Sequence, residues 1–118
     1  MKENALVDFS KQFAVDIVNI CTDIKEHRKS NALLNQLLRS GTSVGANIHE
    51  ANYASSKADF VNKLQIALKE CYETDYWLGL FKDTNMILDT EYDKLFSQCS
   101  KIRKLLIASI TTAKSNKE

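Results

Sequence analysis

Apolar residues recur at steps of three and four along almost the whole chain, with charged residues between them. This period matches one face of an α-helix, which turns by about 100° per residue. Four such runs predict helices over about residues 5–28, 31–53, 56–83 and 90–112. The chain has no proline and only three glycines, so it lacks the residues that strand-and-turn proteins use at their turns. The pattern therefore predicts an all-α fold.

Short connections between the predicted helices favour an antiparallel arrangement. Ser56 and Asp59 have the spacing of a capping box, in which both side chains bind free amides at a helix start. Asn85 follows the third predicted helix, and asparagine tolerates the left-handed backbone that ends many helices. At 118 residues the chain is long enough for one domain with its own core. We predict a single domain, residues 1–118, folded as an antiparallel up-down four-helix bundle.

The second predicted helix carries Gly41 and Gly45 one turn apart on its apolar face. Each glycine costs about 1 kcal/mol of helix stability, but it lets a neighbouring backbone approach closely. The run from Gly41 to Gly45 is no phosphate loop, because it has neither the lysine nor the preceding strand that a P-loop requires. Close helix packing or a bend is expected there.

The third predicted helix has apolar residues on two opposite faces. One face, which includes Leu64 and Leu78, suits the core of the bundle. The second face carries a mixed set of side chains: Ile66, Glu70, Glu73, Tyr76, Trp77 and Leu80. Because the chain's own bundle covers one face, we predict that the second face binds another copy of the protein. The first predicted helix has a weaker second stripe, Val7, Ala14 and Val18, which is typical of ordinary surface.

Beside this second face, the second predicted helix presents four polar residues: Arg39, Ser43, Asn47 and Glu50. If the turn is centred after Ala54, Arg39 comes level with Glu70, since both lie about 15 residues from the turn. In a partly buried pair, loss of one partner costs about 3–5 kcal/mol. A pair in solvent is worth only about 0–1 kcal/mol. Both interpretations remain open, and the pair could form within one chain or between two chains.

The formal net charge is only +1, although charged residues make up 26% of the chain. A protein that relies on phosphate contacts usually has a strong basic excess or a concentrated basic face. The one local basic bias lies in the C-terminal quarter, where the candidate nucleic-acid contacts are Lys94, Lys101, Arg103, Lys104 and Lys114. No apolar run approaches the ~18–20 residues that cross a bilayer, and the N-terminus has no signal-peptide core. We expect a cytoplasmic protein without a membrane partner.

Neither histidine fits a di-iron site, which needs Glu-x-x-His motifs that face the bundle core. Three residues before His27 stands Ile24, and three residues before His49 stands Ala46. No nucleophile, acid–base or zinc motif can be assembled. We therefore predict no enzymatic activity, catalytic residue, metal, cofactor or small-molecule substrate.

The three cysteines, Cys21, Cys71 and Cys99, are odd in number and contain no C-x-x-C motif. Each falls on or beside an apolar helical stripe. This pattern favours buried reduced thiols over a metal site or a disulfide framework.

The aromatic residues of the third predicted helix could in principle stack on the bases of single-stranded nucleic acid. Such platforms need lysine or arginine nearby, but the charges around Tyr72, Tyr76 and Trp77 are acidic, including Glu70 and Glu73. Tyrosine and tryptophan are also enriched at protein interfaces. An oligomer interface or a core position suits these aromatic residues better.

Two runs of the sequence carry a resemblance to a known family. They are LLRSGTSVGANIHEA, residues 37–51, and SKADFVNKLQIALKECYETDYWL, residues 56–78. Together they closely resemble the bacterial four-helix-bundle family named after 23S ribosomal RNA intervening sequences. The resemblance spans about residues 5–110, and it is specific because it joins a small-residue helix to a long K-x-x-I-A-L-K-E-x-x-E-T-x-Y-W helix.

The resemblance implies a ring-shaped homopentamer of up-down bundles without established enzymatic activity. The positions that match the family's signature are Arg39, Asn47, Glu50, Glu70, Glu73 and Trp77. The family is related to the accessory protein of diversity-generating retroelements. Those relatives are strongly basic and bind nucleic acid and a reverse transcriptase, whereas this chain has a net charge of +1.

Two functions follow as expectations. The first is a non-enzymatic, homo-oligomeric bundle that acts as an interaction or scaffold module, with itself as partner. The alternative is a nucleic-acid-binding accessory protein that contacts RNA or DNA, together with a reverse transcriptase, through its basic C-terminal quarter.

Overall fold

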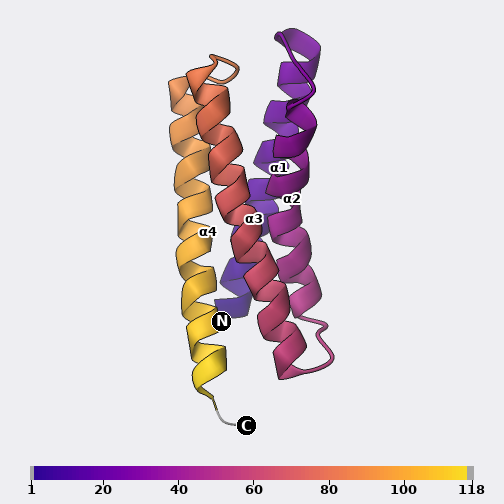
Figure 1. Ribbon diagram of the computed structural model, residues 1–118, viewed down its shortest axis with the longest axis vertical. Coiled ribbons are helices and arrows are strands. Elements are labelled where there is room, and N and C mark those ends of the chain that lie inside the picture. The colour runs from indigo at the N-terminus through magenta and orange to yellow at the C-terminus, as the bar shows by residue number, and fades with distance from the viewer. Residues whose placement is uncertain (1, 117–118) are drawn as a thin grey trace.

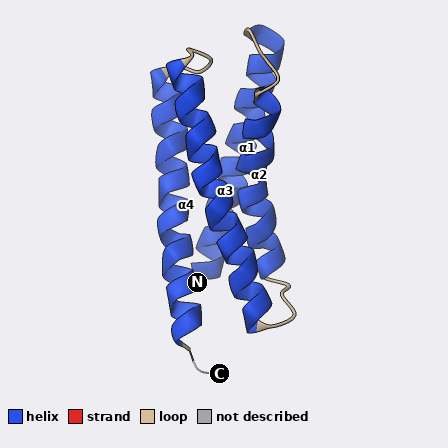
Figure 2. Cartoon of the chain, in the orientation of Figure 1, coloured by secondary structure: helices blue, strands red, loops and turns tan. Residues whose placement is uncertain are grey.

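The structure, a computed structural model, describes the backbone of residues 2–116 and the side chains of residues 5–116. Its four helices are α1 (Lys2–His27), α2 (Leu34–Ala51), α3 (Lys57–Asp83) and α4 (Asp89–Ser115). Each helix packs against the next and α4 closes against α1, whereas no Cα atoms of the diagonal pairs lie within 8 Å of each other in these described residues (Figure 1). The described chain contains no strand (Figure 2). The prediction of an all-α chain with four helices is confirmed.

The helices run alternately up and down, and the bundle measures 51 × 22 × 20 Å (Figure 1). One end, called the upper end because it is at the top of Figure 1, holds the α1–α2 and α3–α4 connections. The lower end holds the α2–α3 connection. No described helix is long and apolar enough to cross a membrane.

The predicted boundaries differ from the observed ones by up to three residues. α1 begins at Lys2 rather than at residue 5, and α4 ends at Ser115 rather than at residue 112. The start of α2 is at Leu34 rather than at residue 31. Asn31 does not cap a helix directly; its Oδ1 accepts a hydrogen bond from the amide of Leu33 at 2.8 Å. This contact makes a turn that precedes the helix. At the other end, the amides of Asn52 and Tyr53 donate to carbonyls three residues back, at 3.2 and 3.0 Å. The last turn is therefore tightened, and the α-helix ends at Ala51.

The predicted signals at both ends of α3 are confirmed. Ser56 Oγ accepts from the amide of Asp59 at 3.0 Å, and Asp59 Oδ2 accepts from the amide of Ser55 at 3.1 Å. Beyond the helix, Asn85 adopts a left-handed backbone with φ of 62°. The capping contacts and the left-handed residue thus define where α3 starts and stops.

The core contains one polar contact between α2 and α3. Ser40 and Thr74 are fully buried. Thr74 Oγ1 lies 2.7 Å from the carbonyl oxygen of Glu70 and 3.0 Å from Ser40 Oγ. The Thr74 hydroxyl can therefore donate to its own helix and accept from Ser40, which satisfies both buried groups.

Gly41 and Gly45 allow α1 and α2 to approach closely, as the sequence predicts. A Cβ added at Gly41 would lie 2.9 Å from two side-chain carbons of Ile17, and one at Gly45 would lie 3.2 Å from the carbonyl oxygen of Ser10. Both positions have an internal reason to lack a side chain.

The prediction that the cysteines are buried is confirmed for Cys21, Cys71 and Cys99. Burial raises the pKa of the Cys21 thiol to about 11. The neighbouring Cys71 side chain, together with burial, raises the pKa of Cys99. Thiols with raised pKa values stay protonated, and protonated thiols are poor nucleophiles.

Candidate interaction surface

An ion-pair network joins α2 to α3 on the outer side of the bundle. Arg39 Nη1 donates to Glu70 Oε1 at 3.3 Å, and Arg39 Nη2 contacts Glu73 Oε2. The indole Nε1 of Trp77 donates to the same oxygen of Glu73 at 3.0 Å. The predicted alignment of Arg39 with Glu70 is confirmed within one chain. Sequence reasoning missed the second contact, to Glu73.

The sequence left open whether the Arg39–Glu70 pair is partly buried or exposed to solvent, and the structure shows an intermediate case. The Arg39 side chain is 51% exposed, whereas that of Glu70 is 17% exposed. Solvent therefore screens the arginine, and the pair contributes closer to the value of a surface salt bridge, about 0–1 kcal/mol. Its structural effect is to hold the Trp77 ring in one position.

Acidification should weaken this network. The hydrogen bonds from Trp77 and Arg39 hold the pKa of Glu73 below its ordinary value. A depressed folded pKa gives stability that is present above the unfolded pKa and is lost as pH falls through the folded pKa. In urea titrations at pH 7 and pH 3, the wild type should lose more free energy of unfolding than Glu73→Gln, by less than about 1 kcal/mol.

The control for that titration is Glu26→Gln, which changes an exposed carboxylate on α1. It should leave the pH dependence of the wild type unchanged. Equal pH dependence in the wild type and in Glu73→Gln would contradict the proposed role of this carboxylate.

The other predicted residues of the α2 face are engaged in contacts within the chain. Asn47 Nδ2 donates to the carbonyl of Ser43 at 2.9 Å, one turn earlier in the same helix. Glu50 Oε1 lies 3.0 Å from Lys63 Nζ on α3. Their role in an oligomer interface stays a prediction.

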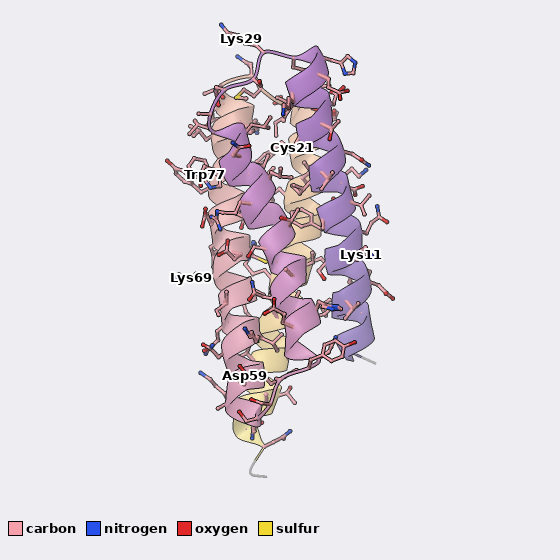
Figure 3. The ribbon with its side chains drawn as sticks, turned by 90° about the vertical axis from the view of Figure 1, so that its right-hand side faces the viewer. Lys11, Cys21, Lys29, Asp59, Lys69 and Trp77 are labelled. Atoms are coloured by element: carbon pink, nitrogen blue, oxygen red, sulfur yellow. The ribbon has the colours of Figure 1, made fainter. Side chains whose placement is uncertain are left out.

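The exposed aromatic surface of α3 centres on two tyrosines. Tyr72 is 54% exposed and Tyr76 is 64% exposed. Trp77 is half-buried and meets Tyr76 edge to face, with ring centroids 5.0 Å apart. Figure 3 shows Trp77 at the outer edge of the bundle. Ile66 and Leu80 are half-buried, so they contribute less open surface than the sequence predicts.

Gly79 continues this surface toward the upper end of α3. Apart from its two chain neighbours and the backbone of its own helix, no described atom lies within 4 Å of a Cβ added at Gly79. Glycine in a helix interior costs about 1 kcal/mol relative to alanine. Unlike Gly41 and Gly45, Gly79 therefore has no neighbour within the described chain that would exclude a side chain. We call Tyr72, Tyr76, Trp77 and Gly79 the aromatic ridge.

Sequence reasoning missed two members of the aromatic ridge. Sequence reasoning left Tyr72 open between an oligomer interface and a core position and did not place it on the second face of the helix, whereas its side chain is 54% exposed. Gly79 gave no signal, since only coordinates show whether space beside a glycine is filled.

The candidate nucleic-acid contacts on α4 divide into engaged and open side chains. Lys94 Nζ lies 3.8 Å from Asp16 Oδ2, and the ammonium of Lys101 lies 4.1 Å from the centre of the Phe9 ring. Lys104 and Lys114 are exposed. The basic surface is therefore interrupted by neighbours from α1.

Arg103 is removed from the candidate phosphate contacts, because its guanidinium forms an ion pair with Asp75 on α3. Both side chains are only 17% exposed. The guanidinium also lies 5.4 Å from the ring centre of Tyr72 and 5.9 Å from that of Phe96. Burial raises the pKa of the Asp75 carboxyl, and the positive charge of Arg103 opposes that rise. This pair is a structural link between α3 and α4.

Two grooves follow the outer side of the α1–α2 pair. The lower groove has a volume of about 390 Å³ and is lined by Val7, Asp8, Ser10, Lys11, Ala14, Thr42, Gly45, Ala46 and His49. The upper groove has a volume of about 220 Å³ and is lined by Val18, Cys21, Thr22, Lys25, Leu34, Asn35 and Leu38. The weak second stripe of the first helix, Val7, Ala14 and Val18, thus borders both grooves.

The outer surface of the bundle offers features that suit binding. Within the part of the chain that the structure describes, no group of three His, Cys, Asp or Glu side chains could hold a metal ion. The prominent features are exposed aromatic rings, a fixed indole and two shallow grooves.

Comparison with known proteins gives a family. The profile of the family described as "23S rRNA-intervening sequence protein" matches residues 2–108. A crystal structure from Bacteroides thetaiotaomicron VPI-5482, described as a protein with unknown function from the S23 ribosomal protein family, superposes with a TM-score of 0.92. It is 48% identical in sequence, and the match covers 94% of this chain and 99% of that chain. No curated protein matches. The resemblance seen in the sequence is confirmed, and the chain belongs to the 23S rRNA-intervening sequence protein family.

Proposed function

We propose that this protein is a non-enzymatic, self-associating four-helix bundle that serves as an interaction or scaffold module in the cytoplasm. The observation that carries the proposal is the aromatic ridge. Tyrosine and tryptophan dominate the binding energy of many interfaces. Here two tyrosines stand open beside an indole that Glu73 already holds in place. A surface that is ordered before binding loses less conformational entropy when it binds.

A homopentameric ring is the assembly that the family resemblance implies, and it forms part of this proposal. Size-exclusion chromatography with light scattering should give a mass several times the 13.4 kDa of one chain. Tyr76→Arg should lower that mass, because it places a charge in the middle of the aromatic ridge; Trp77→Arg should act in the same direction. Tyr76 is the better site, since its ring is exposed and its loss leaves the core intact.

The matched control is Tyr53→Arg, because Tyr53 is 78% exposed and lies just beyond the end of α2. It should keep the mass of the wild type. Circular dichroism should show equal helicity in all four proteins. A wild-type mass of 13.4 kDa across the accessible concentration range would overturn the proposal.

Nucleic-acid binding is the second candidate function, and the exposed lysines of α4 are the feature that favours it. Lys101, Lys104 and Lys114 are exposed on one helix. Fluorescence anisotropy with labelled RNA at low salt should then show binding that weakens when all three become glutamine. The slope of log affinity against log salt should fall by about 0.7 per lysine for a single strand. Lys69→Gln on α3 is the control, and failure to bind RNA at low salt would exclude this candidate.

A further inference from the structure

We infer that the aromatic ridge of one copy seats in the upper groove of a second copy, so that the copies associate head to tail. The inference rests on the proposed self-association and specifies its counter-surface. It also assigns a binding role to the α1–α2 side, which the sequence marks only as a weak apolar stripe.

The two surfaces lie on different sides of the bundle. α3 is diagonal to α1, and no Cα atoms of the two helices lie within 8 Å of each other in the described residues, so no copy can cover its own upper groove with its own ridge. A two-fold interface pairs one patch with the same patch on the partner, whereas a ridge-in-groove contact joins two different patches. In a dimer held by a ridge-in-groove contact, one ridge and one groove remain free. All ridges and grooves are occupied only when the copies form a closed ring.

The ridge and the upper groove stand at the same height along the bundle. Arg39 is level with Glu70 and Glu73, so the stretch of α2 from Arg39 back to Leu34 is level with Tyr72 and Tyr76. Ile17 lies beside Gly41, which places the following turns of α1, including Cys21, at that same height. Figure 3 shows Trp77 and Cys21 both in the upper half of the molecule, on different helices. Rotation about an axis parallel to the bundle preserves height, so a ring needs this match.

The upper groove also suits a tyrosine ring in shape and polarity. Its floor includes Cys21, Leu34 and Leu38, which are buried or half-buried, and Val18 at its side is 42% exposed. In a single chain, Val18 and the half-buried Leu38 stay in contact with water. On the ridge, the missing side chain of Gly79 leaves room for a neighbouring helix to come close to α3. Small residues at a helix contact permit such an approach.

Charges at the upper end point to the same pairing. Lys25 lines the upper groove, and Lys29 follows it near the end of α1; both are exposed. Asp83, the last residue of α3, is exposed beyond the ridge. Docking at equal height brings the acidic end of one surface toward the basic end of the other. The ammonium of Lys25 would also meet the Tyr76 ring of the neighbour, a favourable cation–π arrangement.

A mixing experiment distinguishes this contact from other modes of self-association. Tyr76→Arg damages the ridge and leaves the groove intact, whereas Val18→Arg damages the groove and leaves the ridge intact. Each variant alone should run as a single chain of 13.4 kDa in light scattering. An equimolar mixture should form a one-to-one heterodimer and grow no further, because only one ridge and one groove remain intact. Ile107→Arg, at an α4 side chain that is 44% exposed, should keep the wild-type mass.

Exchanging the charges of two exposed residues gives a second test, and it changes no buried side chain. Lys29→Glu and Asp83→Lys should each weaken assembly at least tenfold in the concentration at half-dissociation, and the double variant should recover most of that loss. If the wild type assembles but Val18→Arg assembles equally well, or the mixture stays monomeric, the inference is wrong and self-association stands. A monomeric wild type overturns the proposed function itself.

Discussion

Replacing Arg103 with methionine should lower the free energy of unfolding by about 3 kcal/mol, the lower end of the range for breaking a buried ion pair. The substitution leaves the carboxylate of Asp75 largely buried without its partner. Asp75 Oδ1 already has no hydrogen-bond partner among the described residues, so the arginine is the main compensation for the buried charge. Urea unfolding at pH 7 measures the loss.

The pH dependence of that loss tests its cause. Burial already raises the pKa of Asp75, and removal of the positive charge should raise it further. A raised folded pKa means that the folded state binds more protons, so the deficit of Arg103→Met should shrink as the pH falls from 7 to 5. Lys104→Met, at the exposed neighbouring position, is the control and should cost less than about 0.5 kcal/mol. A loss below 1 kcal/mol in Arg103→Met at pH 7 would contradict a buried-pair role.

Gly41→Leu should destabilise the protein by about 3 kcal/mol, although leucine is a far better helix former than glycine. The first added carbon would already lie 2.9 Å from Ile17, whose side chain is fully buried and cannot move into solvent. Overpacking on this scale forces α1 and α2 apart. Chemical denaturation monitored by circular dichroism measures the effect.

Two further variants show whether overpacking is the cause. Ile17→Ala in the Gly41→Leu background should recover part of the loss, since it removes the side chain that the leucine meets. Gly79→Leu should instead stabilise the helix by up to about 1 kcal/mol, because nothing in the described chain opposes the new side chain. It is best measured together with Tyr76→Arg, so that assembly does not contribute. Equal effects at Gly41 and Gly79 would contradict this explanation.

The helices of this protein were predictable because helix formation depends on local periodicity, which a sequence displays directly. The start of α2 was not, since the Asn31 side chain binds the Leu33 amide and makes a turn where the pattern already continues. The alignment of Arg39 with Glu70 could be found by counting from the turn, because antiparallel neighbours rise at equal rates.

The remaining features of the site depend on how each helix is rotated about its own axis. Counting residues from a turn gives the height of a side chain but not this rotation. Arg103 was interpreted as a phosphate contact because its charge is visible in the sequence, while its orientation toward Asp75 is not. In the same way, Gly41 and Gly79 look alike in the sequence. One fits against Ile17, and the other faces open space within the described chain.

The buried hydroxyl pair of Ser40 and Thr74 has a consequence for how the chain avoids wrong folds. Leucine and isoleucine along α2 and α3 would pack almost equally well if one helix slid by a turn. In such a shifted competitor, Ser40 would meet an aliphatic neighbour and lose its partner across the interface, at a penalty of about 1–3 kcal/mol. The hydrogen bond between these two hydroxyl groups thus selects one register of α2 against α3.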